Sequence, residues 1–115
     1  MRFSILLFLT FNLLFIASYS YSKTALTGKN IFYNTKGKYG SCNYCHRNGN
    51  SAGRINLETG KIDPEEGRKI PSLKGIGERK DGEQIERSIK LMKKMFGFKL
   101  TDEQISQLVE YLGSL

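Results

Sequence analysis

Apolar residues recur at helical spacing in three segments of this chain, and long polar stretches separate them. The last segment is the clearest, because its apolar residues follow the i, i+3, i+4, i+7 pattern of one helix face: Ile105, Leu108, Val109 and Leu112. Thr101, three residues before Gln104, matches a capping box, in which two side chains bind each other's backbone N–H groups. This pattern predicts a helix that begins after Thr101.

Two more helices are predicted upstream of this one. Residues 82–96 carry an apolar stripe at spacings of three and four: Ile85, Ile89, Met92 and Phe96. Gly97 follows directly and is placed to end the helix. A shorter helix is predicted over residues 24–34, whose apolar side consists of Leu26, Ile31 and Phe32.

The stretch over residues 35–82 is rich in glycine, asparagine and lysine and contains both prolines, Pro64 and Pro71, so little regular structure is expected there. The sequence shows no internal repeat, no low-complexity stretch and no second domain. Residues 23–115 are therefore expected to form one all-α domain with three or more helices joined by long loops. Three helices carry too few apolar residues to pack such a domain well. This indicates that something else completes the core.

The first 22 residues have the composition of a secretory signal peptide. Arg2 provides a positive start, an apolar run covers residues 3–17, and small residues follow, which permits cleavage after Ser20 or Ser22. An uncleaved membrane anchor is the alternative, but the apolar run is shorter than the about 20 residues that a spanning helix needs. We expect an exported, periplasmic protein that contacts the membrane only if this leader is retained.

The chain is basic, with 18 lysines and arginines against 11 aspartates and glutamates and a formal net charge of +7. A basic surface favours acidic partners. The basic residues are scattered rather than gathered into a stripe, and the chain has no nucleic-acid-binding motif. Nucleic acid is therefore not expected as a partner.

The candidate chemistry lies in one pentapeptide, CNYCH, which contains both cysteines and the single histidine: Cys42, Cys45 and His46. Cys-x-x-Cys-His is the attachment signature of c-type haem, in which each thiol adds to a vinyl group and the adjacent imidazole binds the iron. A covalent haem is a large apolar disc. It would supply the core that the helices lack.

Three other interpretations of the pentapeptide are less favoured than haem attachment. A closed zinc site needs four nitrogen or sulfur ligands, and the chain has only three. A thioredoxin-like redox pair would be flanked by alternating strands and helices, which the pattern does not predict. A structural disulfide is compatible with export but leaves His46 unexplained.

Beyond this motif, nearly all of residues 23–115 resemble a class I cytochrome c. The peptide GKNIF (28–32) is similar to the first-helix signature of that family, and VEYL (109–112) to the end of its last helix. The resemblance implies a cytochrome c-like fold around one covalent haem c. It also implies a contact between the two helices, made by Gly28 and Phe32 with Leu108 and Tyr111.

The peptide IPSLKGIGERK (70–80) resembles the loop of that family beside the haem. The resemblance implies a Pro71 carbonyl against the axial imidazole, Leu73 on the haem edge and Arg79 near a propionate. A carbonyl that accepts from the free ring N–H orients a histidine ligand and makes it a better donor. Two insertions depart from compact members: extra residues around NTKGKYGS, and a long loop over 47–70 that would cover one haem edge or form a partner surface.

The resemblance implies a methionine as the second axial ligand, and two are candidates. Met95, in KKMFGFKLTDEQI, has the neighbours typical of the family's ligand and is favoured. Met92 lies one turn earlier, where it also fits an ordinary packing role on the apolar stripe of its helix.

The function expected from these features is electron transfer, without enzyme activity, to redox proteins that have acidic docking surfaces. The lysines expected to steer docking are Lys74, Lys93, Lys94 and Lys99. The main alternative is a haem-bearing subunit of a periplasmic oxidoreductase complex, for example in sulfur-compound oxidation. A gas sensor or weak peroxidase would require an open axial position, and no second histidine is present to assist peroxidase chemistry.

Overall fold

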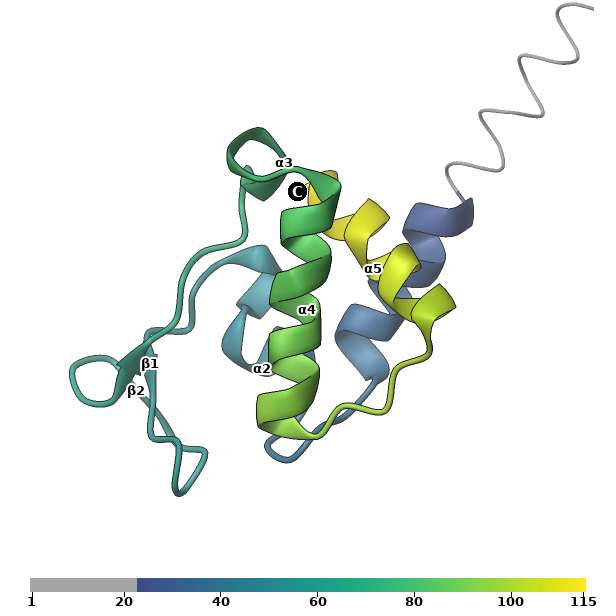
Figure 1. The fold of residues 1–115 in the computed structure, drawn as a ribbon. Helices are drawn as coiled ribbons and strands as arrows, with labels where there is room; N and C mark the ends of the chain where they lie inside the picture. Colours follow the sequence, from purple (N-terminus) through teal and green to yellow (C-terminus); the bar gives the residue numbers. More distant parts are fainter. Residues whose placement is uncertain (1–22) are drawn as a thin grey trace, which may run out of the picture.

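The computed structural model describes residues 23–115, so the predicted signal peptide over 1–22 lies outside the described residues. A helix over 23–34 comes first. The later elements, in chain order, are α2 (Cys42–Cys45), the 3-10 turn η1 (Arg47–Gly49), β1 (Arg54–Ile55), β2 (Ile62–Asp63), β3 (Arg68–Lys69), α3 (Ile76–Arg79), α4 (Gly82–Phe96) and α5 (Asp102–Gly113) (Figure 1). The predicted helix-rich fold is confirmed, and the all-α prediction omits a small sheet.

Capping boxes start both long C-terminal helices, and a glycine ends α4. The predicted capping box of α5 is present, with the Gln104 N–H 3.1 Å from Thr101 Oγ1 and the Thr101 N–H 2.9 Å from Gln104 Oε1. Asp81 and Gln84 form the same arrangement at the start of α4. Gly97 ends α4 in the left-handed conformation, at φ 67°, which glycine adopts without steric cost.

The N-terminal helix packs against α5, as the family resemblance implies. The Phe32 side chain is almost fully buried, and its ring centroid lies 5.5 Å from that of Tyr111 in an edge-to-face contact. Gly28 lies so close to α5 that an added Cβ would overlap the Gln107 carbonyl oxygen and approach Tyr111 Cβ to 2.8 Å. A glycine at residue 28 is therefore required for this close crossing.

The hydrophobic core lies where α4, α5 and the N-terminal helix meet. Its most buried side chains are Phe32, Ile105 and Leu108. Phe98 and Leu100, in the connection between α4 and α5, complete this core. This core is adjacent to the pentapeptide, because the Cys42 side chain packs against it.

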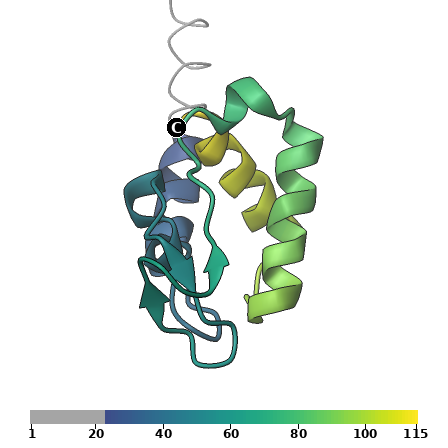
Figure 2. The ribbon, with the colours of Figure 1, turned by 90° about the vertical axis from the view of Figure 1, so that its left-hand side faces the viewer.

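The insertion after the pentapeptide forms a three-stranded antiparallel sheet in the order β2-β1-β3. Arg54 of β1 is paired with Asp63 on one side and Lys69 on the other. The β2–β3 turn is closed by the Asp63 carboxylate, which accepts the N–H groups of Glu65 and Glu66, and these bonds lower the pKa of Asp63. Figure 2 shows the strands in front, with α4 at the right.

Among residues 23–115, none of the helices has the length and apolar content needed to cross a membrane.

Candidate functional site

The pentapeptide forms a single helical turn followed by a sharp bend. Helix α2 contains both cysteines, and the His46 N–H closes it with a 2.9 Å hydrogen bond to the Cys42 carbonyl. Both cysteines are partly buried, and neither forms a disulfide. The two thiols therefore lie one turn apart, directly before the imidazole.

A second set of hydrogen bonds fixes the chain that leaves His46. Asn48 adopts the left-handed conformation at φ 52°, which asparagine tolerates better than most residues. Its N–H lies 2.7 Å from Asn43 Oδ1, and its own Oδ1 accepts from the Tyr33 hydroxyl at 3.0 Å. These contacts tie the bend both to α2 and to the N-terminal helix.

The imidazole of His46 is oriented by the loop that the sequence singles out. His46 Nδ1 lies 3.0 Å from the Pro71 carbonyl oxygen, and because a carbonyl only accepts, Nδ1 carries the proton in this bond. In the neutral ring this leaves Nε2 with a free lone pair, the form that binds metals. Burial lowers the pKa of His46, while the Pro71 carbonyl acts in the opposite direction. The structure thus brings together the predicted ligand and its predicted carbonyl.

Arg79 holds that loop in place. Its guanidinium donates to the Lys74 carbonyl at 2.7 Å and to the Ser72 carbonyl at 3.2 Å. The Leu73 N–H is bound by the Gly49 carbonyl at 2.8 Å. In the structure Arg79 therefore positions the backbone of this loop, and its contact with a propionate stays a prediction.

Three adjoining, mainly apolar cavities surround the pentapeptide, with empty volumes, open mouths included, of about 400, 530 and 630 Å³. His46 and Met92 line all three. The first cavity is bordered by aromatic residues: Tyr39, Tyr44, Phe96 and Phe98. The second is bordered by the core residues Phe32, Ile85 and Leu108, and by Leu73, which packs against the core. We call the three together the crevice.

The third cavity lies between the sheet region and the end of α4. Its walls come from the insertion on one side and from α4 on the other: Ile55, Leu57, Ile70 and Pro71 facing Met92, Met95 and Phe96. Met95 lines this cavity, whereas Met92 also lines the two others beside Cys42. Both methionines therefore share a cavity with His46, and Met92, unlike Met95, also shares two cavities with Cys42.

The thiols are partly buried, and their surroundings favour the uncharged form. Burial, with a smaller contribution from the neighbouring Cys45, raises the pKa of Cys42 to about 11. Burial also raises the pKa of Cys45. Redox-active cysteines in Cys-x-x-Cys motifs have lowered pKa values, so the surroundings do not favour a thioredoxin-like function. In the described part of the chain, no group of three or more His, Cys, Asp or Glu residues is placed to hold a metal ion.

Sequence analysis does not identify several residues that shape the crevice. Phe98 follows the predicted helix, and Tyr39 lies in the glycine-rich stretch, where nothing indicates a role. Ser51 is also missed, although its hydroxyl donates to the Ile70 carbonyl at 2.5 Å and holds the two ends of the insertion together. Among these crevice residues, only Tyr44 could have been identified from the sequence, because it lies inside the pentapeptide.

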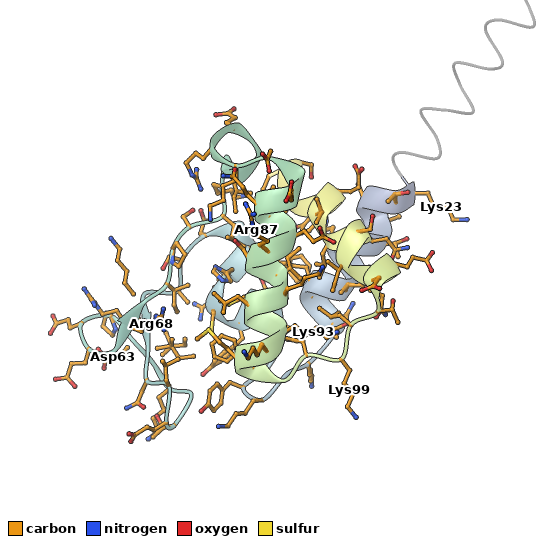
Figure 3. All side chains as sticks on the ribbon, in the orientation of Figure 1. Lys23, Asp63, Arg68, Arg87, Lys93 and Lys99 are labelled. Atoms are coloured by element: carbon orange, nitrogen blue, oxygen red, sulfur yellow. The ribbon has the colours of Figure 1, made fainter. Side chains whose placement is uncertain are left out.

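The four lysines selected from the sequence differ in their availability. Lys74, Lys94 and Lys99 are exposed. Lys93 is half-buried, and its ammonium donates to the Leu100 carbonyl at 2.9 Å. Figure 3 shows Lys93 and Lys99 near the C-terminal end of α4. Lys93 therefore has a structural contact that the other three lack.

No protein-family model matches the chain, and neither does any curated protein or solved structure.

Proposed function

We propose that this chain is a small exported electron-transfer protein of the class I cytochrome c type, with one covalently attached haem c. The observation that carries the proposal is the position of Cys42, Cys45 and His46 in the wall of one apolar crevice. His46 there has its Nδ1 bound by a carbonyl and Nε2 free. Electron-transfer cofactors need such an anchored, largely water-free site.

The residues of the crevice fit a haem. Cys42 and Cys45 are spaced by one helical turn, as the two thioether bonds require, and His46 Nε2 would be the axial nitrogen. The bound haem would supply a one-electron couple at its iron. Residues of the core and the aromatic wall would exclude water from it: Phe32, Leu73, Phe96 and Phe98.

The second axial ligand would be a methionine, Met92 or Met95. The position of Met92 beside Cys42 and His46 in the first two cavities favours Met92, and the sequence neighbours favour Met95. Thioether ligation raises the reduction potential of the iron. With both axial positions filled, the site would transfer electrons without bond chemistry, and we propose no enzyme activity.

The test is the visible spectrum of the protein produced with a haem-attachment system, recorded oxidised, reduced, and reduced under carbon monoxide. We expect haem that stays attached on denaturation, a low-spin spectrum with the weak red ferric–thioether band, and no response to carbon monoxide. The matched control is the double variant Cys42→Ser/Cys45→Ser, which should carry no covalent haem.

Two results would contradict the proposal. If the unaltered chain acquires no covalent haem, the haem reading of the pentapeptide is wrong. If haem is attached but is high-spin and binds carbon monoxide readily, the axial site is open. A ligand-binding function would then replace electron transfer.

A further inference from the structure

The insertion between the pentapeptide and the Pro71 loop covers one side of the crevice. Ile55 and Ile70 are 4% and 5% exposed, yet they lie outside the central hydrophobic core. Both line the third cavity, together with His46 and Met92. Ile55 and Ile70 are therefore buried beside the crevice rather than in the central core.

The insertion has little stability of its own. Each of its three strands is two residues long, and sheets this small are not independently stable in water. Apart from Ile55, the strand residues are only partly buried or exposed. Its position must therefore be set by contacts with the rest of the molecule.

Two tyrosines outside the insertion make those contacts at the loop between β1 and β2. The Tyr44 hydroxyl donates to the Gly60 carbonyl at 2.7 Å. The Tyr39 hydroxyl donates to the Leu57 carbonyl at 2.5 Å, with the Glu58 carbonyl at 3.2 Å. The loop is thus fixed at its tip by two side chains that also line the first cavity.

The Tyr39 ring joins the insertion to α4. Gly60 lies directly on this ring, because a Cβ on Gly60 would overlap it. The same ring makes an edge-to-face contact with Phe96, the last residue of α4, at 6.1 Å between centroids. Tyr39 therefore closes the gap between the insertion and the helix that carries both methionines.

We propose that residues 54–69 form a strap, held shut by the hydroxyls of Tyr39 and Tyr44, that keeps water and small ligands out of the crevice on the Met95 side. This inference rests on the proposed haem site for its effect on the iron. The closed strap would keep external ligands away from a haem held by Cys42, Cys45 and His46. An open strap would admit them to the crevice. Tyr39 and Tyr44 are then positioning residues.

The test uses the protein with covalent haem and the double variant Tyr39→Phe/Tyr44→Phe, which keeps both rings and removes only the hydroxyls. We expect hydrogen exchange of the amides over residues 56–62 to be faster by roughly three- to tenfold for each hydroxyl removed. We also expect the reduced variant to bind carbon monoxide faster than the unaltered protein, when both rates are expressed per attached haem. Exchange in α4 and α5 should not change.

Two further variants make the result specific. Tyr33→Phe removes a tyrosine hydroxyl bonded to Asn48 Oδ1, away from the strap, and should leave exchange over 56–62 unchanged. Gly60→Ala should open the strap by a different route, because its Cβ overlaps the Tyr39 ring and its φ is 75°. It should act in the same direction as the double variant.

The possible failures are distinguishable. If haem is attached but strap exchange does not change, the tyrosines do not hold the strap. If exchange rises and carbon monoxide binding does not, the strap does not guard the crevice, and the inference is again wrong. If the unaltered chain has no covalent haem, the proposed function fails first and the inference fails with it.

Discussion

At the scale of single residues, His46 is held by contacts from three parts of the chain. Its backbone closes α2, its ring is bound by Pro71, and the bend after it is tied to the N-terminal helix through Tyr33 and Asn48. An imidazole oriented in this way needs little rearrangement to bind a metal. Arg79 contributes indirectly to the orientation of His46, because it binds the carbonyls of Ser72 and Lys74 in the same loop as Pro71.

The two methionines can be separated by conservative substitution. Because Met92 lines all three cavities with His46, we expect Met92→Leu to remove the ferric–thioether band, lower the reduction potential and allow carbon monoxide to bind. Met95→Leu serves as the matched control and should keep the band. The reverse pattern would assign the ligand to Met95, as the sequence motif predicts.

The raised pKa of Cys42 predicts a pH dependence for the haem-free chain. A value of about 11 lies above the pKa of about 8.5 for an unfolded cysteine, so the fold favours the protonated thiol. This contribution to stability is complete below about pH 8.5 and is lost as the pH rises toward 11. We expect Cys42 in a Cys45→Ser variant to react with iodoacetamide roughly a hundredfold more slowly at pH 8.5 than an exposed cysteine. Mass spectrometry measures that rate, and a rate equal to that of a peptide would show that the crevice is not formed without haem.

At the scale of elements, the crossing of the N-terminal helix with α5 depends on Gly28. We expect Gly28→Ala to reduce the free energy of unfolding by about 1–3 kcal/mol, because the added Cβ overlaps the Gln107 carbonyl. Denaturant unfolding of the purified protein measures this change. Gly113→Ala is the control, since a Cβ at that glycine meets nothing within 4 Å. Equal stabilities of the two variants would mean that the helices do not cross this closely.

The helix ends and the sheet differ in how far the sequence predicts them. The α5 cap is visible because Thr101 and Gln104 interact with backbone within the same four residues. The sheet is not visible, because strands of two residues such as Arg54–Ile55 are too short for apolar alternation. Their pairing is set by turns and by distant contacts such as those of Tyr39 and Tyr44.

At the scale of the whole molecule, the lysines near the end of α4 differ in how far they are exposed to a partner. Lys94 and Lys99 are exposed there, whereas Lys93 is bound to the Leu100 carbonyl. The Lys38 ammonium lies 5.1 Å from the centre of the Tyr39 ring, at the border of the crevice. An acidic partner would be attracted to this end of the molecule.

We expect the double variant Lys94→Gln/Lys99→Gln to weaken the salt dependence of the rate of electron transfer to an acidic redox partner. Exposed charges steer association, and salt screens them. Stopped-flow rates over a series of ionic strengths measure the effect. Lys23→Gln removes one charge at the start of the N-terminal helix, away from Lys99 in Figure 3, and should have less influence. An unchanged salt dependence in the double variant would exclude this docking surface.

The sequence by itself determined the features that depend on neighbouring residues. These are the three main helices, the α5 cap, the end of α4 at Gly97 and the grouping of Cys42, Cys45 and His46 in one turn. Each results from interactions between residues a few positions apart. The order of the amino acids therefore shows these interactions directly. The Pro71 loop and the Gly28 contact were predicted through a family resemblance rather than through local pattern.

Only the tertiary structure decided which distant residues meet. It placed Met92 but not Met95 in the two cavities that Cys42 lines, bonded the Lys93 ammonium to the Leu100 carbonyl, and buried Ile55 beside the crevice. Some of these contacts join segments that are far apart along the chain. Met92 and Met95 lie about one helical turn apart, so the periodicity of the sequence does not distinguish them. Packing and hydrogen bonding across the folded molecule select among them, because each buried polar group and each apolar surface must find a partner there.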